Sequence, residues 1–278
     1  MDGEKITKKK VIAIVITIGI VAFGAGILFS GSDYYEDDLS SSNQTADADN
    51  CNVVVFSIKG YLSTFAIKQP PEQEVDVSSS EDLMSGILFA ENDHQTKAVM
   101  VLIDSGGGDG VAGEEIANTL KSLSKPNVAV IRTMGASSAY WASTGADKIY
   151  ASKISDVGGI GITSSYLDQS SKDAKDGYKY IELTSAKYKD LGDPSKPLVA
   201  EEKAILLADL KKAHNVFVEE VAQNRNLEVA NVSKIANGLT FVGLDALNYG
   251  LIDEIGDMTS AIKYLEEQIG EKVEFCWY

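Results

Sequence analysis

Short apolar runs alternate with amphipathic segments between residues 52 and 151. Runs rich in Val, Ile and Ala occupy residues 53–58, 98–103, 128–133 and 148–151, and their length is typical of strands buried on both faces. Between the first three runs, apolar residues recur at helical spacing: Leu83, Met84, Ile87 and Leu88, then Val111, Ile116 and Leu120. The alternation predicts an α/β fold, a parallel sheet of repeated βαβ units with ligand sites beyond the carboxyl ends of its strands.

The other segments give more varied signals. Residues 61–77 contain two prolines and are predicted as a loop, and residues 138–143 are predicted as a short helix. Residues 180–184 predict a further strand. Residues 200–224 predict a long helix, and packing within the subunit is the default for its apolar stripe. The stripe consists of Ile205, Leu206, Leu210 and Phe217.

The N-terminus has the pattern of a membrane anchor. Residues 11–30 are uncharged, and twenty residues at about 1.5 Å each span a bilayer core of roughly 30 Å. A cleaved signal peptide is the alternative, but its apolar region is usually shorter. Lysines before the segment and acidic residues after it place the N-terminus in the cytoplasm. We therefore expect a cytoplasmic stretch at 1–10, a transmembrane signal-anchor at 11–30, a flexible acidic tether at 31–51 and an extracytoplasmic domain at 52–278.

Charge and cysteine content exclude several kinds of partner. The net charge is −16, and no basic stripe is present, so nucleic-acid binding is not expected. The chain has two cysteines, Cys51 and Cys276, and no Cys-x-x-Cys pair, so no metal site is expected. The sequence leaves open whether the two cysteines form a disulfide.

A serine-containing turn follows the run at 128–133. Ser137 lies between the end of the predicted strand and the start of the short helix, a position that suits a nucleophile close to helix amides. A helix N-cap serine is the alternative. The glycine loop at 105–110 also follows a strand. It lacks the Gly-Lys-Ser/Thr of a phosphate loop, and its bare amides fit an oxyanion hole better.

A nucleophilic serine needs a general base. His94 lies in a polar turn and His214 within the predicted long helix, so neither context indicates a Ser-His-Asp triad. A lysine that loses its proton is the other option. Three lysines lie close to the predicted strand at 180–184: Lys179 just before it, and Lys187 and Lys189 after it. Their spacing alone does not indicate which of them is the base.

Five segments in the same order resemble the signal peptide peptidase A family of membrane-anchored serine–lysine proteases (peptidase family S49), which share the ClpP/crotonase fold. They are residues 103–116, 135–142, 157–162, 186–190 and 236–256. The resemblance covers about residues 52–268. Four features depart from the family pattern: Gly106 replaces a proline, Ser138 a glycine and Gly159 a serine, and the last segment lacks the family's usual arginine after Gly238.

The resemblance implies the roles of individual residues. Ser137 is the expected nucleophile, Lys189 the general base, and the amides of Gly107 and Ser138 the oxyanion donors. The stretch formed by Gly159, Ile160, Gly161 and Ile162 is expected to pair with an extended substrate. No cofactor is expected. The family assembles as homo-oligomers, in which Ser and Lys come from neighbouring subunits of single-domain members.

These expectations describe a membrane-anchored serine endopeptidase. Its substrates would be peptides such as cleaved signal peptides or misfolded membrane-associated fragments. The first alternative is a catalytically weak membrane-tethered scaffold or peptide-binding partner. A crotonase-type acyl-CoA enzyme on the same fold is the second alternative.

Overall fold

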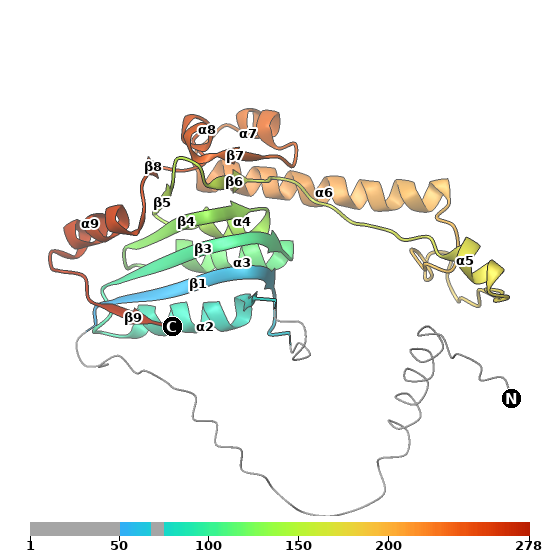
Figure 1. Cartoon of the computed structure of the whole chain (residues 1–278), viewed down its shortest axis with the longest axis horizontal. Helices are drawn as coiled ribbons and strands as arrows, with labels where there is room; N and C mark the ends of the chain where they lie inside the picture. The colour runs from blue at the N-terminus through green and yellow to red at the C-terminus, as the bar shows by residue number, and fades with distance from the viewer. Residues whose placement is uncertain (1–50, 68–74) are drawn as a thin grey trace, which may run out of the picture. The chain divides into compact units, whose positions relative to one another are not determined.

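A sheet of mainly parallel strands forms the centre of the structure (Figure 1). The computed structural model describes residues 51–67 and 75–278. The strands are β1 (Val53–Ser63), β2 (Val77–Ser79), β3 (Ala98–Gly108), β4 (Asn127–Ala136), β5 (Lys148–Ala151), β6 (Asp156–Gly158), β7 (Thr240–Val242), β8 (Glu254–Ile255) and β9 (Phe275–Trp277). Their order is β2-β1-β3-β4-β5-β8, with β9 beside β1 and β6 between β4 and β7. Among the strand pairs of the described residues, only that of β6 with β7 is antiparallel, so the predicted α/β fold is confirmed.

The described residues also form helices, some of which cover the two faces of this sheet. They are α2 (Ser80–Asn92), α3 (Gly110–Lys121), α4 (Ser138–Ser143), α5 (Ser170–Lys175), α6 (Ala200–Asn224), α7 (Val229–Ile235), α8 (Gly243–Asn248) and α9 (Met258–Ile269). The helices α2, α3 and α4 pack on one face, and α9 packs on the other (Figure 1). Two apolar clusters result, one on each side of the sheet.

Strand side chains alternate between these two clusters, as the period of two requires. In β3, Val99, Val101 and Ile103 belong to the cluster under α2–α4. Ala98, Met100 and Leu102 belong to the cluster under α9. Because both faces are covered, the strands read as continuous apolar runs in the sequence.

Several local predictions need correction. The strand β1 continues to Ser63, past Gly60, which has a positive φ at a register shift and lets the chain bulge without breaking the pairing. Within the predicted loop at 61–77, residues 61–63 therefore belong to β1. Val111 is predicted as an inner helical position, but it is 56% exposed at the start of α3. Residues 180–184 form no strand, because their backbone pairs with no neighbouring strand among the described residues.

The long helix α6 is correctly bounded at residues 200–224 but packs over only part of its length. Phe217, Val218, Val221 and Ala222 are its buried apolar residues, and all lie in the C-terminal third. In the predicted stripe, only Phe217 is buried. The default of packing within the subunit is therefore wrong for the N-terminal two thirds of the helix.

A disulfide joins Cys51 to Cys276, with a Cα–Cα distance of 5.6 Å. It ties Cys51, two residues before β1, to β9, which lies beside β1 with Val54 opposite Cys276. In the described residues, no helix is long and apolar enough to cross a membrane. The predicted anchor at 11–30 lies outside the described residues.

Candidate active site

Ser137 occupies a strained turn between β4 and α4. Its φ is 54° and its ψ is −129°, a conformation that non-glycine residues rarely adopt. Two backbone hydrogen bonds hold it there: the Ser137 N–H donates to the Gly158 carbonyl at 2.8 Å, and the Trp141 N–H donates to the Ser137 carbonyl at 2.9 Å. Such a turn at a strand end presents a serine hydroxyl at the rim of the sheet, as in hydrolase nucleophile turns.

Gly107 lies against this turn. Its φ is +98°, and a Cβ at this position would lie 2.8 Å from the Ser137 Cβ and 3.0 Å from the Ser138 N. The glycine is therefore required both by its conformation and by the close approach of its backbone. The fold thus brings together three of the predicted site residues, Ser137, Gly107 and Ser138.

The two predicted oxyanion donors differ in their hydrogen bonds. The Gly107 N–H donates to the Ser105 Oγ at 3.0 Å, and that hydroxyl donates to the Gly60 carbonyl at 2.6 Å. The Ser138 N–H, at the start of α4, makes no hydrogen bond within the described residues. The Ser138 side chain is 98% buried, and its Oγ also lacks a partner there. The Ser138 N–H therefore has no partner in the described residues, whereas the Gly107 N–H is already hydrogen-bonded within its own loop.

The predicted substrate stretch at 159–162 follows β6 beside Ser137. The Gly159 N–H donates to the Leu239 carbonyl at 3.1 Å, and the Gly238 N–H donates to the Ile160 carbonyl at 3.0 Å. The N–H groups of Ile160, Gly161 and Ile162 make no backbone hydrogen bond with the described chain. The stretch therefore pairs on one side and keeps backbone donors available.

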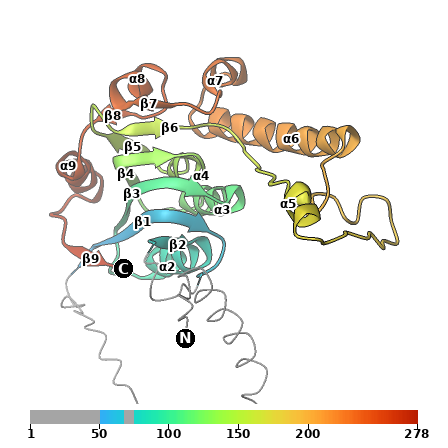
Figure 2. The same ribbon diagram turned by 45° about the vertical axis from the view of Figure 1, so that its right-hand side comes forward.

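Lys189 lies in a segment that extends away from the sheet, which we call the arm (residues 163–216). In both views, α5 and the loop after it lie at the end of α6 that is remote from α4 (Figures 1 and 2). The loop contacts Glu201 at the start of α6, whereas Trp141 of α4 stacks on Phe217 with ring centroids 4.4 Å apart. Sixteen residues separate Glu201 from Phe217, about 24 Å along the helix. One subunit therefore does not bring Lys189 to Ser137.

The surroundings of the arm lysines distinguish them. The Lys187 Nζ lies 2.7 Å from Glu201, whose carboxylate raises the pKa of Lys187 and keeps it charged. Within the described residues, the side chains of Lys179 and Lys189 form no hydrogen bond or ion pair. Lys187 is thus held by an ion pair, whereas the side chains of both Lys179 and Lys189 lack a partner in the described residues.

Sequence reasoning missed the acidic cluster around Lys196. The Lys196 Nζ lies 3.1 Å from Glu202, 3.3 Å from Glu182 and 3.4 Å from Asp190. Desolvation works against the charge, but the three carboxylates raise the pKa of Lys196 above its usual value. Lys196 therefore remains charged. Its ion pairs with Asp190, the residue after Lys189, and with Glu202 connect this loop to the start of α6. No spacing rule in the sequence indicates this cluster.

No metal centre accompanies this site: across the described residues, His, Cys, Asp and Glu side chains form no group that could hold a metal ion. His94 is exposed and His214 lies midway along α6.

Comparison with known proteins gives consistent matches. The sequence model of peptidase family S49 matches residues 119–272, and that of the Clp protease family matches residues 67–153. A protein from Methanocaldococcus jannaschii that is named as a protease is 32% identical over 260 residues, which cover 92% of this chain and 81% of the relative. A signal peptide peptidase SppA assigned in Enterococcus faecium is 25% identical, over 84% of this chain and 69% of the relative. A solved structure of a ClpP1 mutant from Listeria monocytogenes has a TM-score of 0.48 at 15% identity, covering 74% of this chain and 92% of that one.

Proposed function

The chain belongs to peptidase family S49 and is a serine protease, and we propose that its nucleophile is Ser137 and its general base Lys189. The observation that carries the proposal is the turn at Ser137. Its backbone strain is maintained by hydrogen bonds to β6 and α4, and Gly107 packs against it. Strain of this kind persists where surrounding structure holds a functional residue in place.

The proposed reaction is peptide-bond hydrolysis through an acyl-enzyme. The Ser137 hydroxyl attacks the scissile carbonyl carbon while the neutral Lys189 amine accepts the hydroxyl proton, and the resulting ammonium then protonates the leaving amine. The Ser138 N–H donates to the oxyanion at once. The Gly107 N–H joins it by exchanging or sharing its bond to the Ser105 Oγ. Water then hydrolyses the acyl-enzyme with the lysine acting again as base.

We propose that Lys189 reaches Ser137 from a second copy of the chain. The arm exposes large apolar side chains, among them Leu167 (70% exposed), Ile181 (67%) and Leu183 (92%). Such a density of exposed apolar groups favours burial against another protein surface. A head-to-tail arrangement of copies, in which each arm serves the next subunit, would cover the arm and complete each site.

Substrate would bind as an added strand along residues 159–162. The free donors of Ile160, Gly161 and Ile162 suit the backbone carbonyls of an extended peptide that lies beside Ser137. Recognition through the backbone accepts many side chains. The net charge of −16 favours uncharged or basic peptides over acidic ones.

The proposed location is the outer side of a membrane, with residues 11–30 as a single-pass anchor and the N-terminus in the cytoplasm. The disulfide between Cys51 and Cys276 supports this location, because disulfides persist in oxidising compartments. Substrates in such a place include cleaved signal peptides and fragments of misfolded membrane-associated proteins.

Turnover of a fluorogenic peptide panel by the full chain in detergent tests the proposal. Ser137→Ala and Lys189→Ala should each lose activity, whereas Lys187→Ala should retain most of it, because Lys187 is held by Glu201. The rate should rise between about pH 6 and 10, as expected for a base that must be neutral. Full activity of Lys189→Ala would overturn the dyad. An assembled wild-type protein that binds peptides without cleaving them would favour the scaffold alternative.

A further inference from the structure

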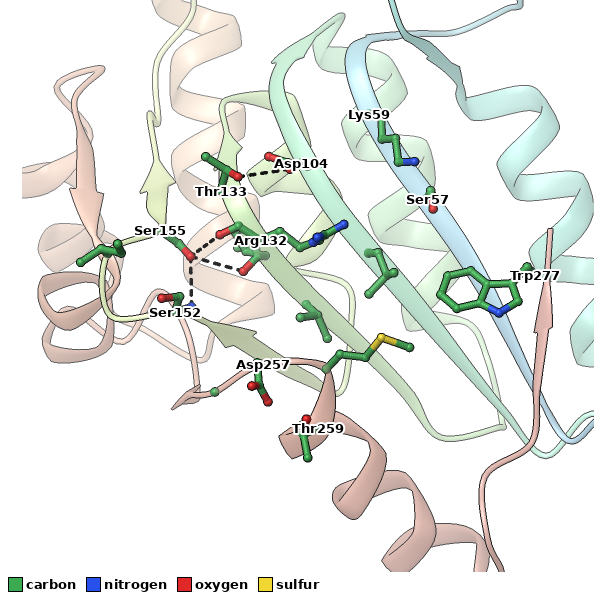
Figure 3. Close-up of a pocket in the computed structure, with 16 residues that line it drawn as sticks. Ser57, Lys59, Asp104, Arg132, Thr133, Ser152, Ser155, Asp257, Thr259 and Trp277 are labelled. Carbon is green, nitrogen blue, oxygen red and sulfur yellow. Dashed lines mark hydrogen bonds between the residues drawn. The ribbon is translucent and has the colours of Figure 1, made fainter.

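A pocket of about 680 Å³ opens on the face of the sheet that carries α9 (Figure 3). We call it the α9-face pocket. It lies at the edge of the apolar cluster under α9. Along β1, β3 and β4, the side chains on this face of the sheet change there from apolar to polar or charged. Val53 and Val55 give way to Ser57 and Lys59, and Leu102 gives way to Asp104. Val130 gives way to Arg132 in the same manner. Its size is typical of small-molecule sites.

Part of the lining of this pocket is apolar. Leu102 and Val130 are buried lining residues, and Met258 and Trp277 also line the pocket. Trp277 is 59% exposed although it is a large aromatic residue, so more than half of its surface is uncovered in the folded chain. An apolar group of a ligand would find contact area here.

The charged side chains that line the pocket differ in whether they have hydrogen-bond partners within the protein. Asp104 accepts hydrogen bonds from the Thr133 hydroxyl and the Met134 N–H, each at 3.3 Å, and Asp257 accepts one from the Ser260 N–H at 3.1 Å. The side chains of Lys59 and Arg132 make no hydrogen bond or ion pair with the described residues. Figure 3 shows the Arg132 guanidinium extending over β3 toward β1, which carries Lys59. Lys59 and Arg132 are exposed cations without a direct ion pair among the described residues. The lining also holds the carboxylates of Asp104 and Asp257, and Asp104 lies opposite Lys59 in the register of β1 and β3.

We propose that the α9-face pocket binds the C-terminal end of a short peptide, its free α-carboxylate on Arg132 and Lys59 and its apolar last side chain over Leu102 and Val130. A planar guanidinium is suited to a carboxylate. Ser152, Asp257 and Thr259 line the opposite side and can bond the amide groups of a peptide. A plain fatty acid would leave these polar groups unpaired.

The proposed ligand is of the class that a protease forms. Each hydrolysis of a peptide bond leaves one fragment with a new α-carboxylate, so products are present wherever this enzyme works. The pocket lies on the face opposite α4, whose first turn contains Ser138, and its lining includes none of the predicted site residues. Binding at the pocket is therefore independent of the proposed Ser137–Lys189 dyad.

Calorimetry with the full chain carrying Ser137→Ala tests the site without cleavage of the probe. The probe is N-acetyl-Ala-Ala-Leu with a free carboxylate, and the control probe is its C-terminal amide. We expect saturable binding of the acid and at least about tenfold weaker binding of the amide, the effect of losing a charged hydrogen bond. Equal affinities, or no binding of the acid, would overturn the proposal.

Variants then place the ligand. Arg132→Gln and Lys59→Gln should each weaken binding of the acid by about tenfold, whereas Lys97→Gln, an exposed lysine outside the pocket, should leave it unchanged. Binding should also change the fluorescence of Trp277, since Trp141 is only 3% exposed, and Trp277→Phe should remove that signal. Loss of binding in Lys97→Gln to the same extent would show non-specific charge attraction and contradict the site.

A third probe distinguishes a peptide from any apolar carboxylate. 4-Methylpentanoate has the carboxylate and the leucine-like body but no amide groups. We expect it to bind at least about tenfold more weakly than the tripeptide, because it makes no bonds to the polar side of the pocket. Equal binding would overturn the assignment to peptides. Because every arm uses the Ser137→Ala chain, failure of the dyad proposal leaves these results unaffected.

Discussion

The sheet around Ser137 and the arm that carries Lys189 differ in how far the single chain buries their apolar side chains. Around Ser137, the strands are buried on both faces, and the turn is fixed by backbone hydrogen bonds to β6 and α4. In the arm, α5 has no buried residue and the first half of α6 buries no apolar side chain. The contrast shows that the single chain fixes the turn at Ser137 but leaves the segment with Lys189 largely exposed.

The joint between these two regions is small. Trp141, one turn after Ser137, stacks on Phe217 with an interplanar angle of 8°, and Asn224 donates to the Thr144 hydroxyl at 3.0 Å. Because the buried apolar residues of α6 all lie in its C-terminal third, the arm depends on its own contacts. Those contacts centre on Lys196.

The largest expected effect is at Gly107. Gly107→Ala should reduce peptide turnover by at least about a hundredfold, since the new Cβ would collide with the Ala136 carbonyl and Ser137 at 2.8 Å and the φ of +98° strains any side chain. Gly106→Ala is the matched control, because the nearest atom to its Cβ, the Met134 Sδ, lies at 3.5 Å. Steady-state kinetics measure both. Equal losses in the two variants would contradict the role of the Gly107 contact.

The next effect concerns the joint. Phe217→Ala should lower the free energy of unfolding by about 3–5 kcal/mol, because a fully buried aromatic ring leaves a cavity beside Trp141. Val216→Ala, at the neighbouring 45% exposed position, should change stability by less than about 1 kcal/mol. Denaturant unfolding followed by circular dichroism compares the two. A small change in Phe217→Ala would mean that α6 is not held by this stack.

A smaller effect is expected at Lys196. Lys196→Met leaves the carboxylates of Glu182, Asp190 and Glu202 without their shared cation, so the loop that presents Lys189 should loosen. We expect kcat to fall by about tenfold with little change in KM, because the substrate stretch at 159–162 is untouched.

Two further variants control for this loss. Lys196→Arg should recover part of the activity. Lys187→Met, which removes an exposed ion pair to Glu201, should cost less than about twofold. Lys196→Met with unchanged kcat would show that the cluster does not position Lys189.

The smallest expected effect is a loss of hydrogen-exchange protection in the arm at acidic pH. The Tyr180 hydroxyl and Lys196 hold the pKa of Asp190 below its usual range. Its charge therefore stabilises the arm above the unfolded pKa, near about 4, and this contribution is lost as pH falls through the lower folded value. Hydrogen exchange should show protection of the arm decreasing relative to the sheet below about pH 4.

Two variants assign this acid effect. In Asp190→Asn the arm should already be less protected at neutral pH, with little further change in acid. Asp176→Asn alters an exposed arm residue and should behave as wild type. Identical acid responses in all three proteins would exclude Asp190 as the cause.

The contrast between sheet and arm also explains what the sequence predicts. Val99–Ile103 and its neighbouring runs need burial on both faces, so their apolar continuity identifies the sheet, and the strand ends identify Ser137 and the glycine loop. The family inferred from these motifs is confirmed by the match to family S49. The strain at Ser137 is not readable from the sequence, because Ser is compatible with ordinary turns as well.

In the arm the same reasoning fails for physical reasons. Residues 180–184 have strand composition, but no sheet edge lies beside them, so they form no strand. The apolar stripe of α6 predicts burial, but within the described residues only Phe217 of the stripe is buried. The Lys196 cluster joins residues up to 20 positions apart, from Glu182 to Glu202, and no local pattern indicates it. The α9-face pocket likewise needs β1, β3, β4, α9 and β9 in place at once.

The most direct test of the account is complementation between two inactive variants. Ser137→Ala retains Lys189, and Lys189→Ala retains Ser137, so co-expressed copies can form a complete site only across a subunit boundary. In a head-to-tail ring of randomly mixed copies, about a quarter of the boundaries would pair an intact serine with an intact lysine. We predict about a quarter of wild-type turnover in the mixed assembly and none in either variant alone. Mixed assemblies without activity would contradict the claim that Lys189 of one subunit serves Ser137 of the next.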